Sequence, residues 1–389
     1  MKNFIRKAAR QGVKEALFLI HDKKALLVFV ILPAMWLILY FGMFSRGLMT
    51  ELPFGIVNPD QSALTEEIES RITAIPSLKT FHYPDTTSAL KAARAGDILG
   101  FMAFDAQFTK RFGTAQTQPI ELYFDRNLYP ASVTLELDIK AAIIDFVYDI
   151  WEGVAQTAGT SGAQARDAAR LITVNNVTIG NIAFNYLTYL IGTLVAGILQ
   201  LLCALAVVTS IVREKLTGNW QAWLAESGVA AGVAGKIVFY AGLYLIFAFL
   251  FIIYVAGYQG FVHVTTPVFL WIATYALFFI VLGCAAFAAT FVIIRVTPVF
   301  AWVGVVVYCA PIYPFTGFSF PAESMDVTAR VFGQCLPLTH FIRAQGSLWF
   351  LGETGGLYSS AIVALVTFAI VFIAIGTLAF KAFDLEHRL

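Results

Sequence analysis

The sequence contains little charge and few cysteines. Asp, Glu, Lys and Arg make up 13% of the 389 residues, whereas hydrophobic residues make up 59%. A soluble domain of this length could not cover so much apolar surface, so a lipid bilayer must solvate much of the chain. The four cysteines are scattered and form no Cys-x-x-Cys pair, which indicates neither a disulfide framework nor a zinc site. We therefore expect an α-helical polytopic membrane protein without a metal site.

The sequence also lacks recognisable catalytic machinery. The best approximation to a phosphate-binding loop, Gly235-Lys236, has Ala230 in place of the first glycine and Ile237 after the lysine. Neither a His-Glu-x-x-His zinc motif nor a Gly-x-Ser-x-Gly nucleophile elbow is present. We therefore expect no catalytic residue, no enzymatic activity and no cofactor bound by this chain. ATP and Mg²⁺, if they are used, would be held by a separate subunit.

Long apolar runs predict the membrane topology, since about 20 apolar residues span the hydrocarbon as a helix. Lys and Arg gather before the first run, after the second and after the sixth, while the connector 258–267 has none. The positive-inside rule then predicts both termini in the cytoplasm. We expect six transmembrane helices in the plasma (inner) membrane, at 25–44, 183–212, 237–257, 268–294, 298–315 and 359–380.

The centres of these runs contain no Asp, Glu, Lys, Arg or His. Ion-coupled transporters and charge-ringed channels usually need ionisable groups at that depth, so both classes are disfavoured. Outside the N-terminus there is no basic patch with interleaved aromatic residues, and we expect no nucleic-acid partner.

The polar segments predict the domain organisation. Residues 1–24 form a basic amphipathic helix, expected in the cytoplasmic headgroup layer or, alternatively, free in the cytoplasm. After transmembrane helix 1 (25–44), residues 45–180 show a βαβαβ rhythm and then a long helix, which predicts an extracytoplasmic α/β domain inserted between helices 1 and 2. Residues 181–389 hold helices 2–6, with a polar loop at 213–236 and a proline-rich, aromatic external region at 311–358. We interpret the stretch 308–349 as a re-entrant helical pair joined by a turn at 319–323.

Polar and aromatic residues recur in and near the second and fifth runs. They are candidates to line a pathway for an amphiphilic substrate. The alternative is ordinary hydrogen bonding between helices and an aromatic belt at the membrane surface. The candidates are Asn185, Tyr189, Gln200, Trp302, Tyr308 and Tyr313.

Three groups of residues occur in order along the predicted spans. They are Lys14-Glu15 with Asp22 and Pro33; Arg213-Glu-Lys with Gly218 and Gly235-Lys236; and residues 315–325 followed by 336–343. With these groups the chain resembles the membrane (permease) subunit of type-2 ABC transporters, in the subgroup with a large external domain between the first two spans. The resemblance covers nearly the whole length.

The resemblance implies a dimer in which each copy meets an ATPase subunit through the N-terminal helix and the loop after the second span. On the helix it points to Arg6, Arg10, Lys14 and Glu15. On the loop we expect Arg213, Glu214 and Lys215 to orient the segment, and Trp220, Trp223 and Leu224 to make apolar contact with the ATPase. The alternative for the tryptophans is anchoring in the headgroup layer. Gly218 and Lys236 complete the loop.

The implied function is ATP-driven export of a hydrophobic or amphiphilic substrate by a homodimer or close heterodimer. A periplasmic adaptor and an outer-membrane channel are further partners that the subgroup often has. The alternative is a mechanotransmitting subunit, which couples a cytoplasmic ATPase to an external partner without transport. A lipid-modifying enzyme would need a catalytic cluster that the sequence does not contain.

Overall fold

The computed structural model describes residues 1–43, 49–112, 120–125, 129–157, 190, 192–258, 266–293, 298–310 and 313–388. The chain divides into two compact units. The helical unit comprises Met1–Gly47 and Thr178–Leu389, and the α/β unit comprises Leu48–Val177.

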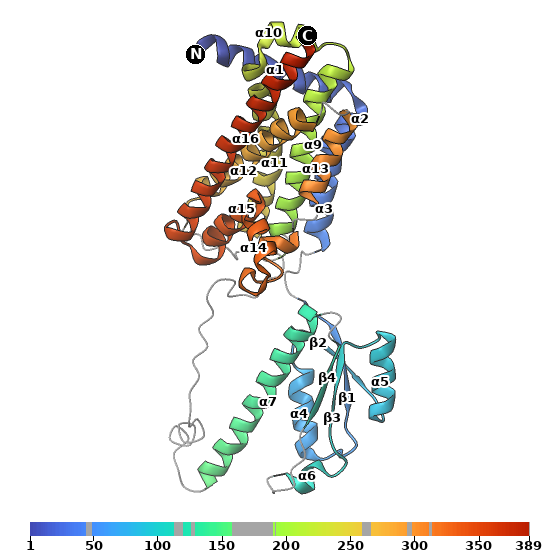
Figure 1. The fold of residues 1–389 in the computed structure, drawn as a ribbon. Helices are drawn as coiled ribbons and strands as arrows, with labels where there is room; N and C mark the ends of the chain where they lie inside the picture. The colour runs from blue at the N-terminus through green and yellow to red at the C-terminus, as the bar shows by residue number, and fades with distance from the viewer. Residues whose placement is uncertain are drawn as a thin grey trace. The chain divides into compact units, whose positions relative to one another are not determined.

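Most of the helical unit consists of long apolar helices (Figure 1). Five described helices are long and apolar enough to cross a membrane, and a further apolar helix is shorter. The shorter helix has 12 residues, which reach about 18 Å against about 30 Å of hydrocarbon. The predicted count of six spans therefore stays a prediction. The helices are α2 (Lys23–Leu26) continuing through a π-helical turn (Leu27–Ile31) into α3 (Leu32–Met43), then α9 (Gly192–Leu216), α11 (Val229–Tyr258), α12 (Val268–Ile293), the shorter α13 (Pro298–Cys309) and α16 (Gly356–Arg388).

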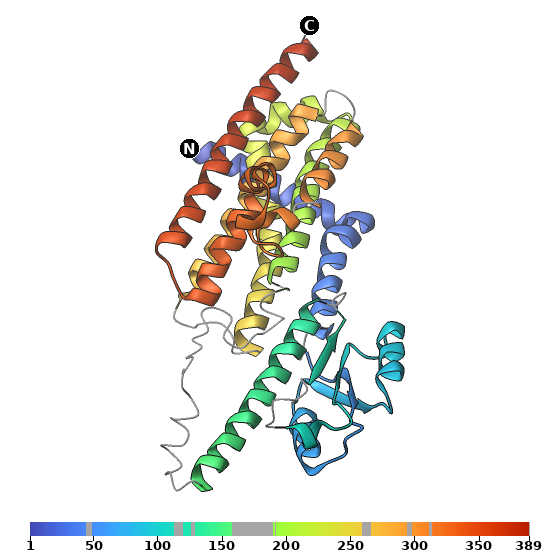
Figure 2. The same cartoon turned by 60° about the horizontal axis from the view of Figure 1, so that its bottom comes forward.

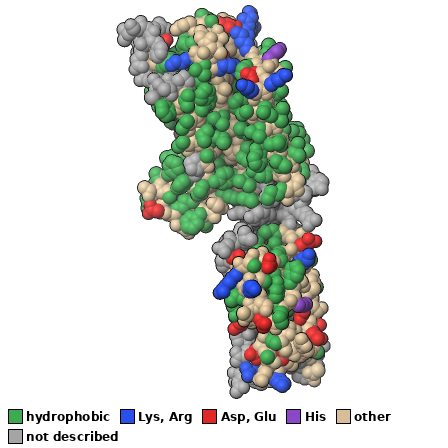
Figure 3. Space-filling view, turned by 90° about the vertical axis from the view of Figure 1, so that its right-hand side faces the viewer, with side chains coloured by type: hydrophobic (Ala, Val, Ile, Leu, Met, Phe, Trp, Pro, Cys, Tyr) green, Lys and Arg blue, Asp and Glu red, His purple; other side chains and the backbone are tan. Residues whose placement is uncertain are grey.

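Charged side chains gather at one end of the helical unit. This end carries α1 (Lys2–His21), the short helix α10 (Trp220–Ser227) and the C-terminal end of α16 (Figures 1 and 2). Figure 3 shows Lys, Arg, Asp and Glu side chains there, above a flank that is mostly hydrophobic. We call it the α1–α10 end.

Asp22 separates α1 from the first apolar helix, because its carboxylate accepts hydrogen bonds from the amides of Lys24 and Ala25 and caps α2.

The proline-rich region folds as short helices. A 3₁₀ turn at Tyr313–Thr316 is followed by α14 (Val327–Gln334), α15 (Pro337–Gly346) and a π-helical turn at Ser347–Leu351. The predicted turn at 319–323 lies between the 3₁₀ turn at Tyr313–Thr316 and α14, and it overlaps a short 3₁₀ helix at Ala322–Ser324; it does not join α14 to α15. Asp326 caps α14, and Pro337 occupies the first turn of α15, so the helices meet at 335–336.

The α/β unit has a four-stranded sheet in the order β2-β1-β3-β4. The first three strands are mutually parallel and β4 runs antiparallel to β3, as the βαβαβ rhythm predicts for its parallel part. The strands are β1 (Leu52–Val57), β2 (Leu78–His82), β3 (Gly100–Ala103) and β4 (Glu121–Phe124). The helices are α4 (Ala63–Thr73), α5 (Thr86–Ala95), α6 (Phe108–Arg111) and α7 (Tyr129–Thr157).

Helices cover both faces of this sheet. α4 and α7 pack on one face around Phe54 and Ile72, and α5 packs on the other around Phe101 and Ala89 (Figure 1). The loop after β1 is held by Asp60, whose carboxylate accepts a hydrogen bond from a threonine hydroxyl on α6. The α/β unit thus has its own two-sided core, independent of the helical unit.

Candidate functional site

α1 presents three different faces. Gln11 and Glu15 are buried where the helix packs on α11. An exposed apolar stripe includes Ile5 and Val13, which are 57% and 59% exposed. The cationic face comprises Arg6, Arg10 and Lys14. The sequence predicted the apolar and cationic faces; the third exists because α1 lies directly against another helix of the chain.

Glycines allow α1 and α11 to approach closely. A Cβ atom added to Gly235 would lie 2.8 Å from the Cβ of Gln11 and would collide with the carbonyl oxygen of Ala8. On the facing helix, Gly12 lies 3.7 Å from the Gly235 carbonyl oxygen by the same measure. Gly235, which the sequence interpretation placed at the end of the polar loop, therefore serves helix packing.

Glu15 is the centre of a buried charge network. Its side chain is fully buried and accepts from Lys236 Nζ at 2.6 Å, Arg213 Nη2 at 2.7 Å and the Tyr240 hydroxyl at 3.0 Å. These donors come from the end of α9 and the beginning of α11. One carboxylate therefore ties the N-terminal helix to two apolar helices that follow it by about 200 residues in the sequence, as the separations of 198 and 221 residues show.

Lys236 completes the network on the opposite side. Its ammonium group is also fully buried and donates to Glu214 Oε1 and to the carbonyl oxygen of Ser210, each at 2.8 Å. We call Glu15, Arg213, Glu214 and Lys236 the Glu15 network. Its two carboxylates balance its two cations. This pairing offsets the free energy that it costs to remove the charges from water. The sequence interpretation ended the polar loop at Lys236; the structure instead begins α11 at Val229 and places this lysine inside the helix.

The tryptophans of α10 pack inward. Trp223 is 4% exposed, and a Cβ atom on Gly232 would lie 2.5 Å from its ring. The ring centroid of Trp220 lies 5.2 Å from the ring centroid of Trp223 and 5.9 Å from that of Phe291. Trp223 is thus part of the chain's own core, whereas the sequence predicted an ATPase contact for it. Trp220 and Leu224 are half-buried, and the outward face of α10 carries Gln221, Ala222 and Ala225.

Short turns frame α10. Gly218 has φ 71° and Gly228 has φ 69°, left-handed values that glycine adopts without strain. Gly218 lies two residues after the end of α9, and Gly228 directly follows α10. Lys215 Nζ lies 4.8 Å from the centre of the Phe383 ring. The predicted loop 213–236 is therefore the end of α9, a short turn, α10 and the first turns of α11.

A second, exposed set of charges links α10 back to α1. The carboxylate of Glu226 forms a short ion pair with Lys14 and lies 3.7 Å from Arg10 Nη1. We call these three residues the Glu226 clasp. Its side chains are 34%, 48% and 61% exposed for Glu226, Lys14 and Arg10, in contrast to the fully buried Glu15–Lys236 pair. The hydrogen bond from Lys14 is the main reason that the pKa of Glu226 is lowered.

The candidate pathway residues divide into two groups. Gln200 Nε2 donates to the carbonyl oxygen of Cys309 at 3.3 Å, and Trp302 Nε1 donates to Thr209 Oγ1 at 3.0 Å. Both bonds join α9 to α13, so these polar groups serve contact between helices, which was the alternative interpretation.

Tyr308 belongs to α13, and Tyr313 follows it and packs on α9. The Tyr308 hydroxyl is buried without a hydrogen-bond partner among the described residues. The ring of Tyr313 covers Gly197, where an added Cβ atom would come within 2.5 Å of it. Asn185 and Tyr189 lie outside the described residues.

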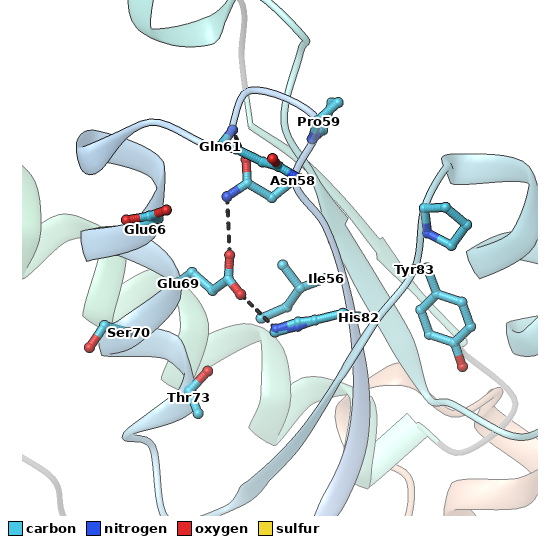
Figure 4. Close-up of a pocket in the computed structure, with 11 residues that line it drawn as sticks. Ile56, Asn58, Pro59, Gln61, Glu66, Glu69, Ser70, Thr73, His82 and Tyr83 are labelled. Carbon is cyan, nitrogen blue, oxygen red and sulfur yellow. Dashed lines mark hydrogen bonds and ion pairs between the residues drawn. The ribbon is translucent and has the colours of Figure 1, made fainter.

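The α/β unit contains a polar pocket of about 790 Å³ beside α4, at the ends of β1 and β2 (Figure 4). Glu69 lies within it and accepts from Asn58 Nδ2 at 3.1 Å and from His82 Nε2 at 2.6 Å. Both carboxylate oxygens of Glu69 are thus engaged. In the parts of the chain that the structure describes, no group of three or more His, Cys, Asp or Glu residues could hold a metal ion.

Sequence reasoning missed three participants at the α1–α10 end: Gln11, Tyr240 and Glu226. Gln11 and Glu226 carried a weak signal, because Gln11 lies one helical turn before Glu15 and Glu226 lies in the loop already under consideration. Tyr240 carried none, since an aromatic residue in an apolar run is usually a packing residue.

Comparison with known proteins bears on the identity of the chain. Residues 23–378 match the family described as ABC-2 family transporter protein. No curated protein and no solved structure matches the chain. The match includes the whole α/β unit and all of the apolar helices except the last turns of α16 beyond residue 378, and it leaves out the whole of α1. With the apolar helices of the helical unit, it establishes that this chain is a membrane permease of the ABC-2 transporter family.

Proposed function

We propose that the chain is the permease subunit of an ATP-driven ABC exporter, and that a separate cytoplasmic ATPase docks on the α1–α10 end. The family implies an ABC ATPase partner, and the sequence contains no phosphate-binding loop of its own. The observation that carries the proposal is the Glu15 network. It joins α1 to α9 and α11, while the exposed Glu226 clasp joins α1 to α10.

The geometry supports a simple transmission of force. ATP binding on the partner would move α1 and α10, and the Glu15 network would carry that displacement to α9 and α11. α9 is in turn bonded to α13 through Gln200 and Trp302. We propose that the two copies of a homodimer or close heterodimer enclose the pathway for a hydrophobic or amphiphilic substrate, and that α9 and α13 move together at its wall. Both termini would lie in the cytoplasm and the α/β unit outside it, where it would meet a periplasmic adaptor and an outer-membrane channel.

Purification of the chain from its native membrane, under conditions that preserve complexes, tests the docking. Co-purification of an ABC ATPase is expected, and recovery of the chain without any ATPase would contradict the proposal. Reconstitution of the complex in proteoliposomes then tests export, with ATP-dependent movement of a fluorescent amphiphile as the expected result.

A mechanotransmitting role is the second candidate, because the α/β unit has its own core and could respond to ATPase motion as a body. It predicts an ATP-dependent change in the protease sensitivity of the α/β unit without flux of any tested solute.

A further inference from the structure

Glu226 lies between two clefts at the α1–α10 end. The smaller cleft, of about 80 Å³, is bordered by Arg6, Lys7 and Arg10. The larger cleft, of about 420 Å³, is bordered by Lys14 and by residues of α9 and α10. Glu226 and Gln11 border both. The carboxylate therefore sits where a group entering from outside would first meet the cationic face of α1.

The charges around these clefts are unequal. Arg6, Lys7, Arg10 and Lys14 all belong to α1, and among the described residues Glu226 is the acidic side chain paired with this face. The other carboxylates nearby belong to the Glu15 network and are engaged by Arg213 and Lys236. A site with this surplus of positive charge fits an acidic partner.

Gln11 gives an independent indication of an acceptor. Its side chain is 1% exposed, yet Nε2 has no hydrogen-bond partner among the described residues. A buried donor without a partner is unfavourable, and natural structures satisfy nearly all such groups. Since Gln11 borders both clefts, an acceptor oxygen brought into either of them could pair with it once the clasp opens.

The Glu226 clasp is the contact at this end that opens most easily. Its members are partly exposed, and exposed ion pairs contribute little to stability because water and salt screen them. The Glu15–Lys236 pair is fully buried, and removing one partner would leave an uncompensated charge. A competing acid could therefore displace Glu226 from Lys14 and Arg10 while the buried network stays intact.

We propose that the cationic face of α1 binds an acidic segment of the ATPase subunit, and that Glu226 occupies this site as an intramolecular competitor until the ATPase docks. This rests on the proposed function, which supplies the partner. An anionic membrane is the other acidic surface available. The contacts favour the ATPase, because the cations border the clefts against α10, whereas the exposed apolar residues Ile5 and Val13 border neither cleft.

The test uses the full chain with the ATPase that co-purifies with it, and measures affinity as a function of salt. Glu226→Gln should bind the ATPase about two- to fivefold more tightly, the range that follows from removing an exposed ion pair. Lys14→Gln should bind it more weakly and with a smaller salt dependence. The control is Glu353→Gln, which removes an exposed carboxylate just before α16 and should change nothing.

The direction of the effect decides the proposal. Tighter binding by Glu226→Gln with weaker binding by Lys14→Gln supports it. Weaker binding by both variants would show that Glu226 itself contacts the ATPase or only stabilises α10, and an unchanged affinity would show that no competition exists; either result overturns it. If Glu226→Gln instead increases binding of the chain's α1 to phosphatidylglycerol vesicles while ATPase affinity is unchanged, the occupant is the membrane and the proposal is wrong. Failure of any ATPase to co-purify with the unaltered chain would be a separate result, against the proposed function itself.

Discussion

Removal of the buried lysine tests whether the Glu15 network holds the α1–α10 end together. Lys236→Met replaces the ammonium group by an apolar side chain of similar length and leaves Glu15 with Arg213 and Tyr240 as its donors. Breaking a buried ion pair in this way costs about 3–5 kcal/mol, because Glu15 and Glu214 then share Arg213 as their one cation and one negative charge is left uncompensated. At about 2–4 °C per kcal/mol, the variant should unfold roughly 6–20 °C below the unaltered protein.

The measurement is thermal unfolding of the chain in lipid nanodiscs. Glu15→Gln should lower Tm by a similar amount, whereas the double variant should lose about 0.5–3 kcal/mol less than the sum of the two, since directly interacting residues are not additive. Lys381→Met removes an exposed lysine at the end of α16 and serves as control, with an effect within about 0.5 kcal/mol. The reasoning is refuted if Lys236→Met behaves like the control, or if the double variant is additive within about 0.5 kcal/mol.

Three further predictions follow from close contacts and hydrogen bonds. Gly235→Ala should separate α1 from α11, loosen the helix around its exposed basic residues and speed their cleavage by trypsin. Gly242→Ala on the same helix, where an added Cβ atom meets nothing within 4 Å, should leave digestion unchanged. Gly197→Ala should force a tyrosine ring away from α9 and lower stability by about 1–3 kcal/mol, measured as Tm; an unchanged Tm would contradict the packing described. The hydrogen bond from a threonine on α6 lowers the pKa of Asp60 from 3.8, so its stabilising contribution is present above that value and is lost as the pH falls through the lowered pKa. In Asp60→Asn the free energy of unfolding of the α/β unit should therefore fall less steeply as the pH is lowered. Urea denaturation at pH 2–7 measures this, and the same fall in both proteins would rule it out.

The parts of the fold that could be predicted from sequence are those with a local pattern. Apolar runs predicted the long helices, and the alternation of short apolar runs with helical segments predicted the parallel part of the sheet. The boundary of the fifth run could not be found this way, since its apolar composition continues past Cys309 although the helix ends there. Composition alone does not distinguish a helix from aromatic 3₁₀ turns such as Tyr313–Thr316.

The candidate site was only half predictable, because its decisive contacts are far apart in the sequence. Arg213, Glu214 and Glu15 stood out as charges near apolar runs. Their pairing did not, since Glu15 and Lys236 are 221 residues apart. Lys236 was assigned to a loop because a lysine beside an apolar run usually marks its boundary, whereas a buried carboxylate on α1 allows it to lie within α11. Trp223 was assigned to a partner interface because it lies in the polar loop. Its inward packing depends on Gly232 of α11, where the missing side chain leaves room for the ring.

The two sets of charges at the α1–α10 end differ in what a docking partner can do to them. An ATPase that binds α1 gains little by disrupting the Glu15–Lys236 pair, since both side chains are fully buried and any group it offers must compete with the partners that they already have. The Glu226 clasp offers no such resistance, because water already solvates part of each member. Docking of the ATPase should therefore replace Glu226 as the partner of the cationic face. It should move α1, α9 and α11 as one body instead of separating them. With a weak Glu226 clasp and a strong Glu15 network, the surface can bind and release an ATPase repeatedly while α1 stays attached to the membrane helices.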